Sequence, residues 1–228
     1  MEAIILAGGL GTRLQSVVKK EPKVMAKIKG KPFLHYLFKY LAKSGIEKVI
    51  LSVGYKHESV LDYFKYEYSG VKINYCIEEK CLGTGGAIKK SLSLVNNENV
   101  FILNGDTLFI IDLLEMSKYQ RSTSADVVIA LKQIQDSERY GKVEIDDTGR
   151  VKHFSEKEFI KSGYINGGLY LVKKDFLTKV NFSDDSFSIE KDVFEKYFND
   201  ILVYGFCSND FFIDIGIPED YSRAQNLL

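Results

Sequence analysis

The sequence has little cysteine, and its cysteines are scattered. Cys76, Cys81 and Cys207 are the three thiols in 228 residues, and their spacing matches no metal-ligand pattern. A small, odd number of cysteines is typical of proteins that work in a reducing compartment. We therefore expect no cysteine-based metal site and a cytoplasmic location.

The chain also lacks an excess of charge of either sign. Lysine plus arginine and aspartate plus glutamate each total 31, and the isoelectric point is about 6.8. A neutral chain has no diffuse positive field that would attract nucleic acid or an anionic membrane. We expect neither partner, and we expect positive charge to matter only where it is local.

Long hydrophobic runs are missing as well. The first apolar run covers residues 3–7, and no basic leader precedes it, so it is too short for the core of a signal peptide. No uninterrupted apolar stretch approaches the ~20 residues that a membrane-spanning helix needs. These absences again favour a cytoplasmic protein.

The first half of the chain alternates segments typical of strands and of helices. Apolar runs predict buried strands, and helical spacing of apolar residues predicts the helices between them. The predicted strands cover residues 3–7, 48–53, 71–77 and 99–104, and the predicted helices cover residues 33–41, 60–64 and 84–94. This alternation predicts an α/β fold with a mixed, mainly parallel sheet and helices on both faces.

The second half is less regular and richer in strands. We expect strands at residues 125–131 and 168–172, a hairpin formed by residues 142–145 and 151–154, a helix over residues 187–198, and a final helix that begins at residues 217–221. No linker, low-complexity segment or internal repeat divides the chain. One large domain or two small ones fit this length.

A glycine-rich loop follows the first strand. Gly8, Gly9 and Gly11 have no Cβ atoms, so backbone N–H groups can closely approach an anion there. Arg13 and Lys23 add cations suited to phosphate oxygens. The loop is neither a dinucleotide-binding fingerprint nor a Walker loop, because the closing glycine of the first and the Gly-Lys-Ser/Thr of the second are missing. Turn glycines and surface lysines are the alternative interpretation.

Two carboxylates follow later predicted strands. In a parallel sheet, ligands bind beyond the carboxyl ends of the strands. We therefore expect the glycine loop, Glu78 and Asp106 to share one edge of the sheet. Asp106 could hold Mg²⁺ there, or it could be a turn aspartate satisfied by local amides.

The opening stretch resembles the signature of the sugar-nucleotide pyrophosphorylases, which are nucleotidyltransferases. The matching residues are 6–14, Pro22-Lys23 and Gly30-Lys-Pro32, whereas Ser16 and Val24 stand where many members have proline. The resemblance implies a Rossmann-like nucleotidyltransferase fold with a small β-rich sugar-binding part. It implies one catalytic domain over residues 1–228, with residues 1–121 mainly binding nucleotide and 122–228 mainly binding sugar phosphate, and no C-terminal β-helix domain.

The resemblance also implies the roles of individual residues. It assigns catalysis to Arg13, Lys23 and Asp106, and it assigns Mg²⁺ binding to Asp106 and Asp214. The implied nucleotide-binding residues are Leu6, Ala7, Gly8, Gly9, Gly11, Thr12, Arg13, Lys23, Glu78, Gly83 and Thr84. The implied substrate-binding residues are Asp106, Gly141, Glu156, Lys157, Asn166 and Gly167.

In the family motif, Glu156 would accept hydrogen bonds from sugar hydroxyls and Lys157 would contact the sugar phosphate. Taken without the family, an exposed Glu-Lys pair is more often a solvated surface. Asn166 and Gly141 have equally ordinary alternatives, at a strand start and in a turn. His153 lies near this motif and has no assigned role.

Within the family, residues 14–18 and 82–88 are most similar to the D-glycero-D-manno-heptose 1-phosphate guanylyltransferases, which make GDP-heptose for bacterial surface polysaccharides. The implied partners are GTP and a sugar 1-phosphate, and a homodimer is one expected state. A hexose 1-phosphate guanylyl- or uridylyltransferase is the alternative. Two alternatives belong to other classes of protein: a nucleotide-binding regulator without catalytic activity, and a metal-dependent glycosyltransferase. The spacing of Asp210 and Asp214 does not match the Asp-x-Asp motif of the glycosyltransferases.

Glu78 predicts which nucleotide base the protein selects. The family's base-reading position often lies five residues before the glycine that is Gly83 here. An ionised glutamate offers only acceptors, and guanine presents two adjacent donors, N1–H and the exocyclic amino group. Uracil and thymine would place carbonyl oxygens against this charge. Glu78 therefore favours GTP, unless its side chain faces solvent with Glu79 and Lys80.

Overall fold

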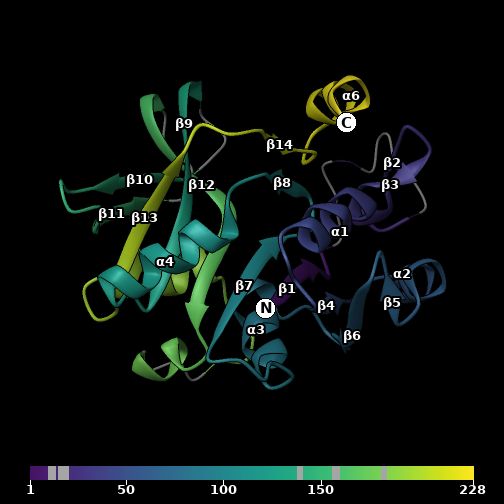
Figure 1. Ribbon diagram of the computed structural model, residues 1–228, viewed down its shortest axis with the longest axis horizontal. Coiled ribbons are helices and arrows are strands. Elements are labelled where there is room, and N and C mark those ends of the chain that lie inside the picture. The colour runs from purple at the N-terminus through teal and green to yellow at the C-terminus, as the bar shows by residue number, and fades with distance from the viewer. Residues whose placement is uncertain (10–13, 15–20, 138–140, 156–159, 181–183) are drawn as a thin grey trace.

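A continuous sheet of ten strands forms the centre of the protein (Figure 1). The computed structural model describes residues 1–9, 14, 21–137, 141–155, 160–180 and 184–228. The strand order in the sheet is β11-β10-β12-β7-β1-β4-β6-β5, with β9 also paired to β12 and β13 paired to β9. The predicted α/β fold is confirmed.

The parallel part of the sheet comes from the first half of the chain. It contains β1 (Glu2–Ala7), β4 (Lys48–Val53), β6 (Val71–Ile77) and β7 (Asn99–Asn104), with the short β5 (Glu67–Tyr68) antiparallel at the edge. Each of the four longer strands was predicted, because each is an apolar or alternating run. The carboxyl ends of these four parallel strands all lie at the same end of the sheet.

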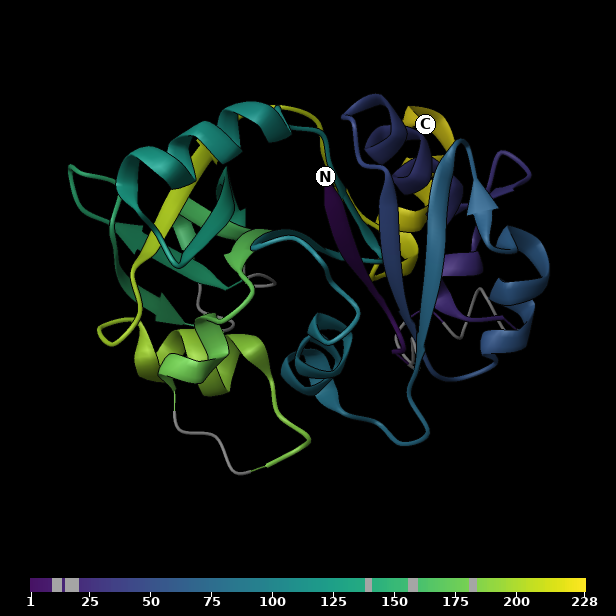
Figure 2. The same ribbon diagram turned by 60° about the horizontal axis from the view of Figure 1, so that its bottom comes forward.

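Helices cover both faces of the sheet, and alternate residues of β1 explain why. Ala3 and Ile5 pack into one core with α1 (Phe33–Lys43), α2 (His57–Phe64) and α4 (Leu113–Thr123). Ile4 points to the opposite core, together with α3 (Gly83–Leu92). Figure 2 shows α4 on one side of the strands and α3 on the other.

The helix α1 illustrates how the local sequence sets its bounds. Leu34, Leu37, Phe38 and Leu41 recur at helical spacing and are fully buried. The chain leaves the helix through Gly45, whose φ of +77° lies in the left-handed region that glycine adopts without strain.

The second half completes the sheet through one long strand, β12 (Ile160–Lys173). It pairs antiparallel with β7, with β9 (Val127–Ser137) and with β10 (Lys142–Ile145). The predicted hairpin is confirmed, with β10 antiparallel to β11 (Val151–Ser155). The strand predicted over 125–131 began two residues too early and ended too soon, and the one predicted over 168–172 began too late, because pairing between β9 and β12 extends both strands beyond their apolar runs. β13 (Val203–Ser208) runs parallel to β9.

The helix predicted over residues 187–198 was only partly right. The structure has a π-helix η4 (Ile189–Phe194) followed by a short α5 (Glu195–Tyr197), and a 3₁₀-helix η3 (Phe176–Lys179) precedes them. Phe187 is held by backbone hydrogen bonds with Leu82 and Gly85, of 3.0 Å and 2.9 Å. This anchor on α3 prevents the helix from starting earlier, and Ser188 caps η4 instead.

Several short elements escaped prediction because they contain too few residues for a pattern. These are β2 (Lys27–Ile28), β3 (Lys31–Pro32), the 3₁₀-helix η2 (Lys23–Met25), β8 (Thr107–Phe109) and β14 (Phe212–Asp214). The final helix α6 (Pro218–Leu227) begins at Pro218, as predicted. None of the helices in the described ranges is long and apolar enough to cross a membrane.

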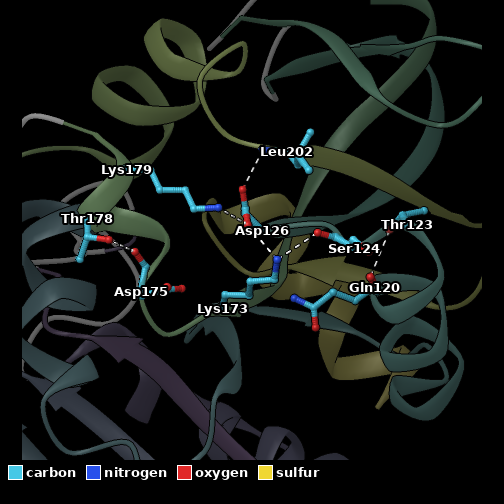
Figure 3. Close-up of polar contacts among 9 residues, drawn as sticks. All are labelled: Gln120, Thr123, Ser124, Asp126, Lys173, Asp175, Thr178, Lys179 and Leu202. Carbon is cyan, nitrogen blue, oxygen red and sulfur yellow. Dashed lines mark hydrogen bonds and ion pairs between the residues drawn. The ribbon is translucent and has the colours of Figure 1, made fainter.

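A buried carboxylate joins several strands at the end of the sheet opposite to the carboxyl ends of the parallel strands (Figure 3). Asp126 is 1% exposed and lies just before β9. Its Oδ1 accepts hydrogen bonds from Lys173 Nζ at 3.0 Å and Lys179 Nζ at 2.7 Å, and its Oδ2 accepts one from the Leu202 amide at 3.1 Å. This cluster ties β9, β12 and the approach to β13 together away from the candidate site.

Candidate active site

A cavity of about 340 Å³ lies where the parallel strands end. Its wall combines the ends of β1 and β7, the residues after β6 and the start of α3. The lining residues are Leu6, Ala7, Gly8, Gly9, Lys23, Val24, Glu78, Cys81, Gly83, Thr84, Ala87, Asn104, Asp106 and Gly216. The structure thus brings together the glycine loop, Glu78 and Asp106 at the edge of the sheet where the sequence predicted them.

The first part of the glycine loop packs against Glu78. A Cβ atom on Gly8 would lie 2.3 Å from Glu78 Oε1, so only glycine leaves room for the carboxylate there. Glu78 Oε1 also accepts a 2.9 Å hydrogen bond from Ser52 Oγ. The remaining predicted residues of this loop, Gly11, Thr12 and Arg13, lie outside the described residues.

Lys23 reaches the cavity from η2. Its ammonium forms an ion pair with the carboxylate of Asp106, with the two side chains 12% and 31% exposed. Pro22 precedes η2 with a φ of −55°, which sets the backbone direction into this turn. The partly buried pair places a movable cation beside the carboxylate at the end of β7.

Asp214 is brought beside Asp106 by the two-stranded sheet of β8 and β14. Asp214 pairs with Thr107 in the antiparallel register, and the Ile215 amide donates a 2.9 Å hydrogen bond to the Asp106 carbonyl. Asp214 Oδ1 also accepts from the Gly216 amide at 2.6 Å. A Cβ atom on Gly216 would lie 2.8 Å from Asp214 Oδ1 and 3.2 Å from Lys23 Nζ, so this glycine touches both groups.

These oxygen donors suit a hard divalent cation. Carboxylates are the preferred side-chain ligands of Mg²⁺, which often takes only one or two from the protein and the rest from phosphates and water. The ammonium of Lys23 already lies against one of them, which shows that the site accommodates positive charge. Among the described residues, no group of three or more His, Cys, Asp or Glu could hold a metal. A cation held by Asp106 and Asp214 would therefore take its remaining ligands from phosphates and water.

The start of α3 forms the opposite wall. Gly83 has a φ of +67°, and a Cβ atom there would lie 2.5 Å from the Phe187 carbonyl. Thr84 Oγ1 donates a 2.7 Å hydrogen bond to Glu190 Oε2 and accepts one from the Ile189 amide at 2.9 Å. Glu190 was not predicted, because a glutamate inside a charged helical segment carries no distinguishing signal in the sequence.

Glu190 continues into a polar network around Tyr170. The hydroxyl of Tyr170 donates to Glu190 Oε1 at 3.3 Å and accepts from Asn166 Nδ2 at 2.7 Å. Burial raises the pKa of the Tyr170 hydroxyl well above its ordinary value, and the negative charge of Glu190 adds to the effect. The hydroxyl therefore stays protonated at physiological pH and donates a hydrogen bond to Glu190.

Three of the other predicted sugar-binding residues, Gly141, Asn166 and Gly167, are not among those that line the cavity. Asn166 uses its Oδ1 to accept from the Gly168 amide at 3.0 Å, and its backbone amide donates to the Gly141 carbonyl at 3.1 Å. A Cβ atom on Gly167 would lie 2.5 Å from the Phe109 ring, so this glycine permits close packing under β8. Glu156 and Lys157 lie outside the described residues.

The cavity is also lined by residues that were not predicted as part of the site, namely Val24, Cys81, Ala87, Asn104 and Gly216. Asn104 was identifiable, since it is the last residue of β7 and comes two positions before Asp106. The others carry no signal in the sequence, because apolar or small residues at such positions serve equally well as core.

Comparison with known proteins places this site in a family. The chain is 53% identical to D-glycero-alpha-D-manno-heptose 1-phosphate guanylyltransferase of Aneurinibacillus thermoaerophilus, over 100% of this chain and 98% of the relative. It is 48% identical to the enzyme of the same name from Campylobacter jejuni, over 97% of each chain. The crystal structure of HddC from Yersinia pseudotuberculosis superposes with a TM-score of 0.89, at 36% identity over 99% of this chain and 98% of that chain.

HddC has also been solved in complex with GMP-PN, and that structure superposes with a TM-score of 0.88. The sequence matches the Nucleotidyl transferase family over residues 2–228, which is nearly the whole chain. The match covers the strands, the glycine loop and the two aspartates that form the cavity described above. The chain therefore belongs to the Nucleotidyl transferase family.

Proposed function

We propose that the protein transfers GMP from GTP to D-glycero-α-D-manno-heptose 1-phosphate, giving GDP-heptose and pyrophosphate. The full-length similarity to two guanylyltransferases with this substrate supports the assignment. The structural observation that carries it is that Glu78 lines the cavity, with its carboxylate held by Ser52, where it would serve as an acceptor for the base.

In the proposed reaction, an oxygen of the sugar 1-phosphate attacks the α-phosphorus of GTP. The new P–O bond joins the two phosphates, and the bond between the α-phosphorus and its bridging oxygen breaks, so pyrophosphate leaves with the electron pair. The attacking phosphate is already ionised, and no general base is needed. Catalysis then depends on aligning two anions that repel each other and on neutralising their charge.

Lys23 is suited to bridge the reacting phosphates, because its ammonium lies at the cavity wall and is held there by Asp106. We assign the β- and γ-phosphates to the glycine loop and Arg13, and the sugar phosphate to Lys157, on the basis of the family motifs. Asp106 and Asp214 would hold Mg²⁺. When bound, this ion would supply positive charge for the phosphate oxygens.

Base selection is assigned to Glu78. Its Oε1 touches Gly8 and accepts from Ser52, and the residue lies beside the cavity. An ionised carboxylate has about four acceptor positions, so it can accept from Ser52 and from two donors of guanine. Uracil would present a carbonyl oxygen to the same charge, which costs binding free energy.

The test is a matrix of GTP, UTP, ATP and CTP against heptose and hexose 1-phosphates, with pyrophosphate release as the measurement. GTP with the heptose 1-phosphate is expected to give the highest kcat/KM. Replacement of Glu78 by Gln should lower the ratio of kcat/KM for GTP over UTP. Equal kcat/KM for GTP and UTP in the unmutated protein would contradict the proposal.

A second candidate changes only the sugar. The chain is 34% identical to mannose-1-phosphate guanylyltransferase of Mycobacterium tuberculosis over 99% of its length, although it covers 64% of that relative. Under this alternative, mannose 1-phosphate would exceed the heptose 1-phosphate in the same matrix while GTP remained the preferred nucleotide. The matrix therefore separates the two candidates directly.

A further inference from the structure

Ser52 is a polar residue at the centre of the sheet. It lies in β4, between Leu6 of β1 and Cys76 of β6, and it has no exposed surface. Its neighbours along the strand, Leu51 and Val53, are buried and apolar. A buried hydroxyl costs free energy unless it is hydrogen-bonded, so its partner explains its presence.

That partner is the carboxylate of Glu78. Ser52 Oγ donates to Glu78 Oε1 at 2.9 Å. The Glu78 amide donates to the Val53 carbonyl at 2.7 Å, which holds the backbone of Glu78 beside the end of β4. Glu78 is therefore fixed at its backbone by one residue of β4 and at its side chain by the residue before it.

The glycine loop closes the other side of this carboxylate. The position that a Cβ atom on Gly8 would take is 2.3 Å from Glu78 Oε1, and a Cβ atom on Gly54 would lie 3.7 Å from Glu78 Cβ. The two glycines therefore leave the room that this position of the carboxylate needs, and the hydrogen bond from Ser52 holds one of its oxygens in place. The remaining acceptor positions of the carboxylate are the ones available to a ligand.

We propose that Ser52 is a positioning residue for base selection: it does not line the cavity, and it orients Glu78 from inside the sheet. This inference rests on the proposed role of Glu78 in reading the base. A rotamer held in advance contributes to specificity because less freedom is lost when the base binds. Loss of Ser52 would then change the KM for the nucleotide and the preference for one base. The reaction at the phosphates would proceed as in the unmutated protein.

The test is the Ser52→Ala variant, assayed with GTP and UTP. We expect the GTP over UTP ratio of kcat/KM to fall about tenfold, the scale of one hydrogen bond to a charged group. The loss should come mainly from a higher KM for GTP, with kcat within about twofold of the unmutated value. A purely structural hydroxyl would change both nucleotides alike.

Ser91 provides a matched control. It lies in α3, has no exposed surface, and its Oγ has no hydrogen-bond partner within the described part of the chain. Ser91→Ala removes a buried hydroxyl without removing a contact, so the base ratio should stay at the unmutated value. Thermal unfolding of both variants would show that each is folded at the assay temperature.

The Glu78→Gln background separates failure of this inference from failure of the proposed function. Ser52→Ala should have no further effect on the base ratio there, because the carboxylate that it orients is gone. If the unmutated protein shows no GTP preference, the proposed function is wrong. If it prefers GTP and Glu78→Gln reduces that preference, but Ser52→Ala leaves the ratio unchanged or lowers kcat/KM equally for both nucleotides, the role of Ser52 is wrong.

Discussion

Lys23 and Asp106 form an ion pair that joins two segments 83 positions apart in the sequence. One partner comes from the turn η2 after the glycine loop, and the other follows β7. Because both residues line the cavity, the pair places a cation in its wall, where the proposed reaction needs positive charge. Removal of Asp106 would also leave Lys23 without this ion-pair partner in the protein before substrate binds.

Replacement of Asp106 or Asp214 by Ala should nearly abolish turnover. Both carboxylates are the proposed ligands of Mg²⁺, and deleting a preorganised charge stabiliser typically costs ~10²-fold or more in kcat. Pyrophosphate release, measured over a range of Mg²⁺ concentrations, checks this. Asp62→Ala, at an exposed position of α2, is the control and should keep full activity. Full turnover in excess chelator would contradict the metal assignment.

The cations should differ in the kinetic constant that they change. Arg13→Ala should raise the KM for GTP, and Lys157→Ala should raise the KM for the sugar phosphate. Lys23→Ala should mainly lower kcat, because its contacts strengthen as charge moves in the transition state. Steady-state kinetics with each substrate varied in turn is the measurement. The assignment fails if Lys157→Ala impairs GTP binding and leaves the sugar-phosphate KM unchanged.

Thr84 should contribute to stability through its hydrogen bonds between α3 and η4. Thr84→Val removes the hydrogen bonds to Glu190 and to the Ile189 amide and keeps the shape of the side chain. We expect a loss of about 1–3 kcal/mol in the free energy of unfolding, measured by urea denaturation. Thr84→Ser retains the hydroxyl and is the control. Equal stability of the two variants would show that these bonds contribute nothing.

Asp126 should make the stability depend on acidic pH. Burial alone would raise the pKa of this carboxyl, but hydrogen bonds from Lys179, the Leu202 amide and Lys173 outweigh it, and the pKa lies below its ordinary value. A carboxyl with a lowered folded pKa stabilises the protein above its unfolded pKa of about 3.9, and this contribution is lost as the pH falls through the folded pKa.

We therefore expect Asp126→Asn to lower the free energy of unfolding by about 2 kcal/mol at pH 7, since it removes a buried charge whose two lysines are partly exposed. The difference from the unmutated protein should shrink as the pH is lowered below about 4. Asp62→Asn breaks an exposed pair with Lys65 and should stay within about 0.5 kcal/mol. A constant difference between pH 7 and pH 3 would contradict the assigned cause.

Local patterns were enough to predict the longer strands and helices as far as β7, although they missed the helix α4. The strand 48–53 was predicted to the residue as β4. Because the carboxyl ends of parallel strands meet, the same patterns predicted that Gly8, Glu78 and Asp106 share one edge. The second half was harder to predict, since pairing between β9 and β12 extends both strands past their apolar runs.

Local sequence therefore set the elements and the edge at which they place charged residues, since strand and helix formation depends on neighbours along the chain. Only the tertiary structure decided which distant side chains meet: Lys23 with Asp106, Thr84 with Glu190, and Ser52 with Glu78. Ser52 interrupts an apolar strand, a visible signal whose partner the sequence alone does not specify. Such pairs form because burial forces each polar group to find a partner, and the packing of whole elements determines which one is within reach.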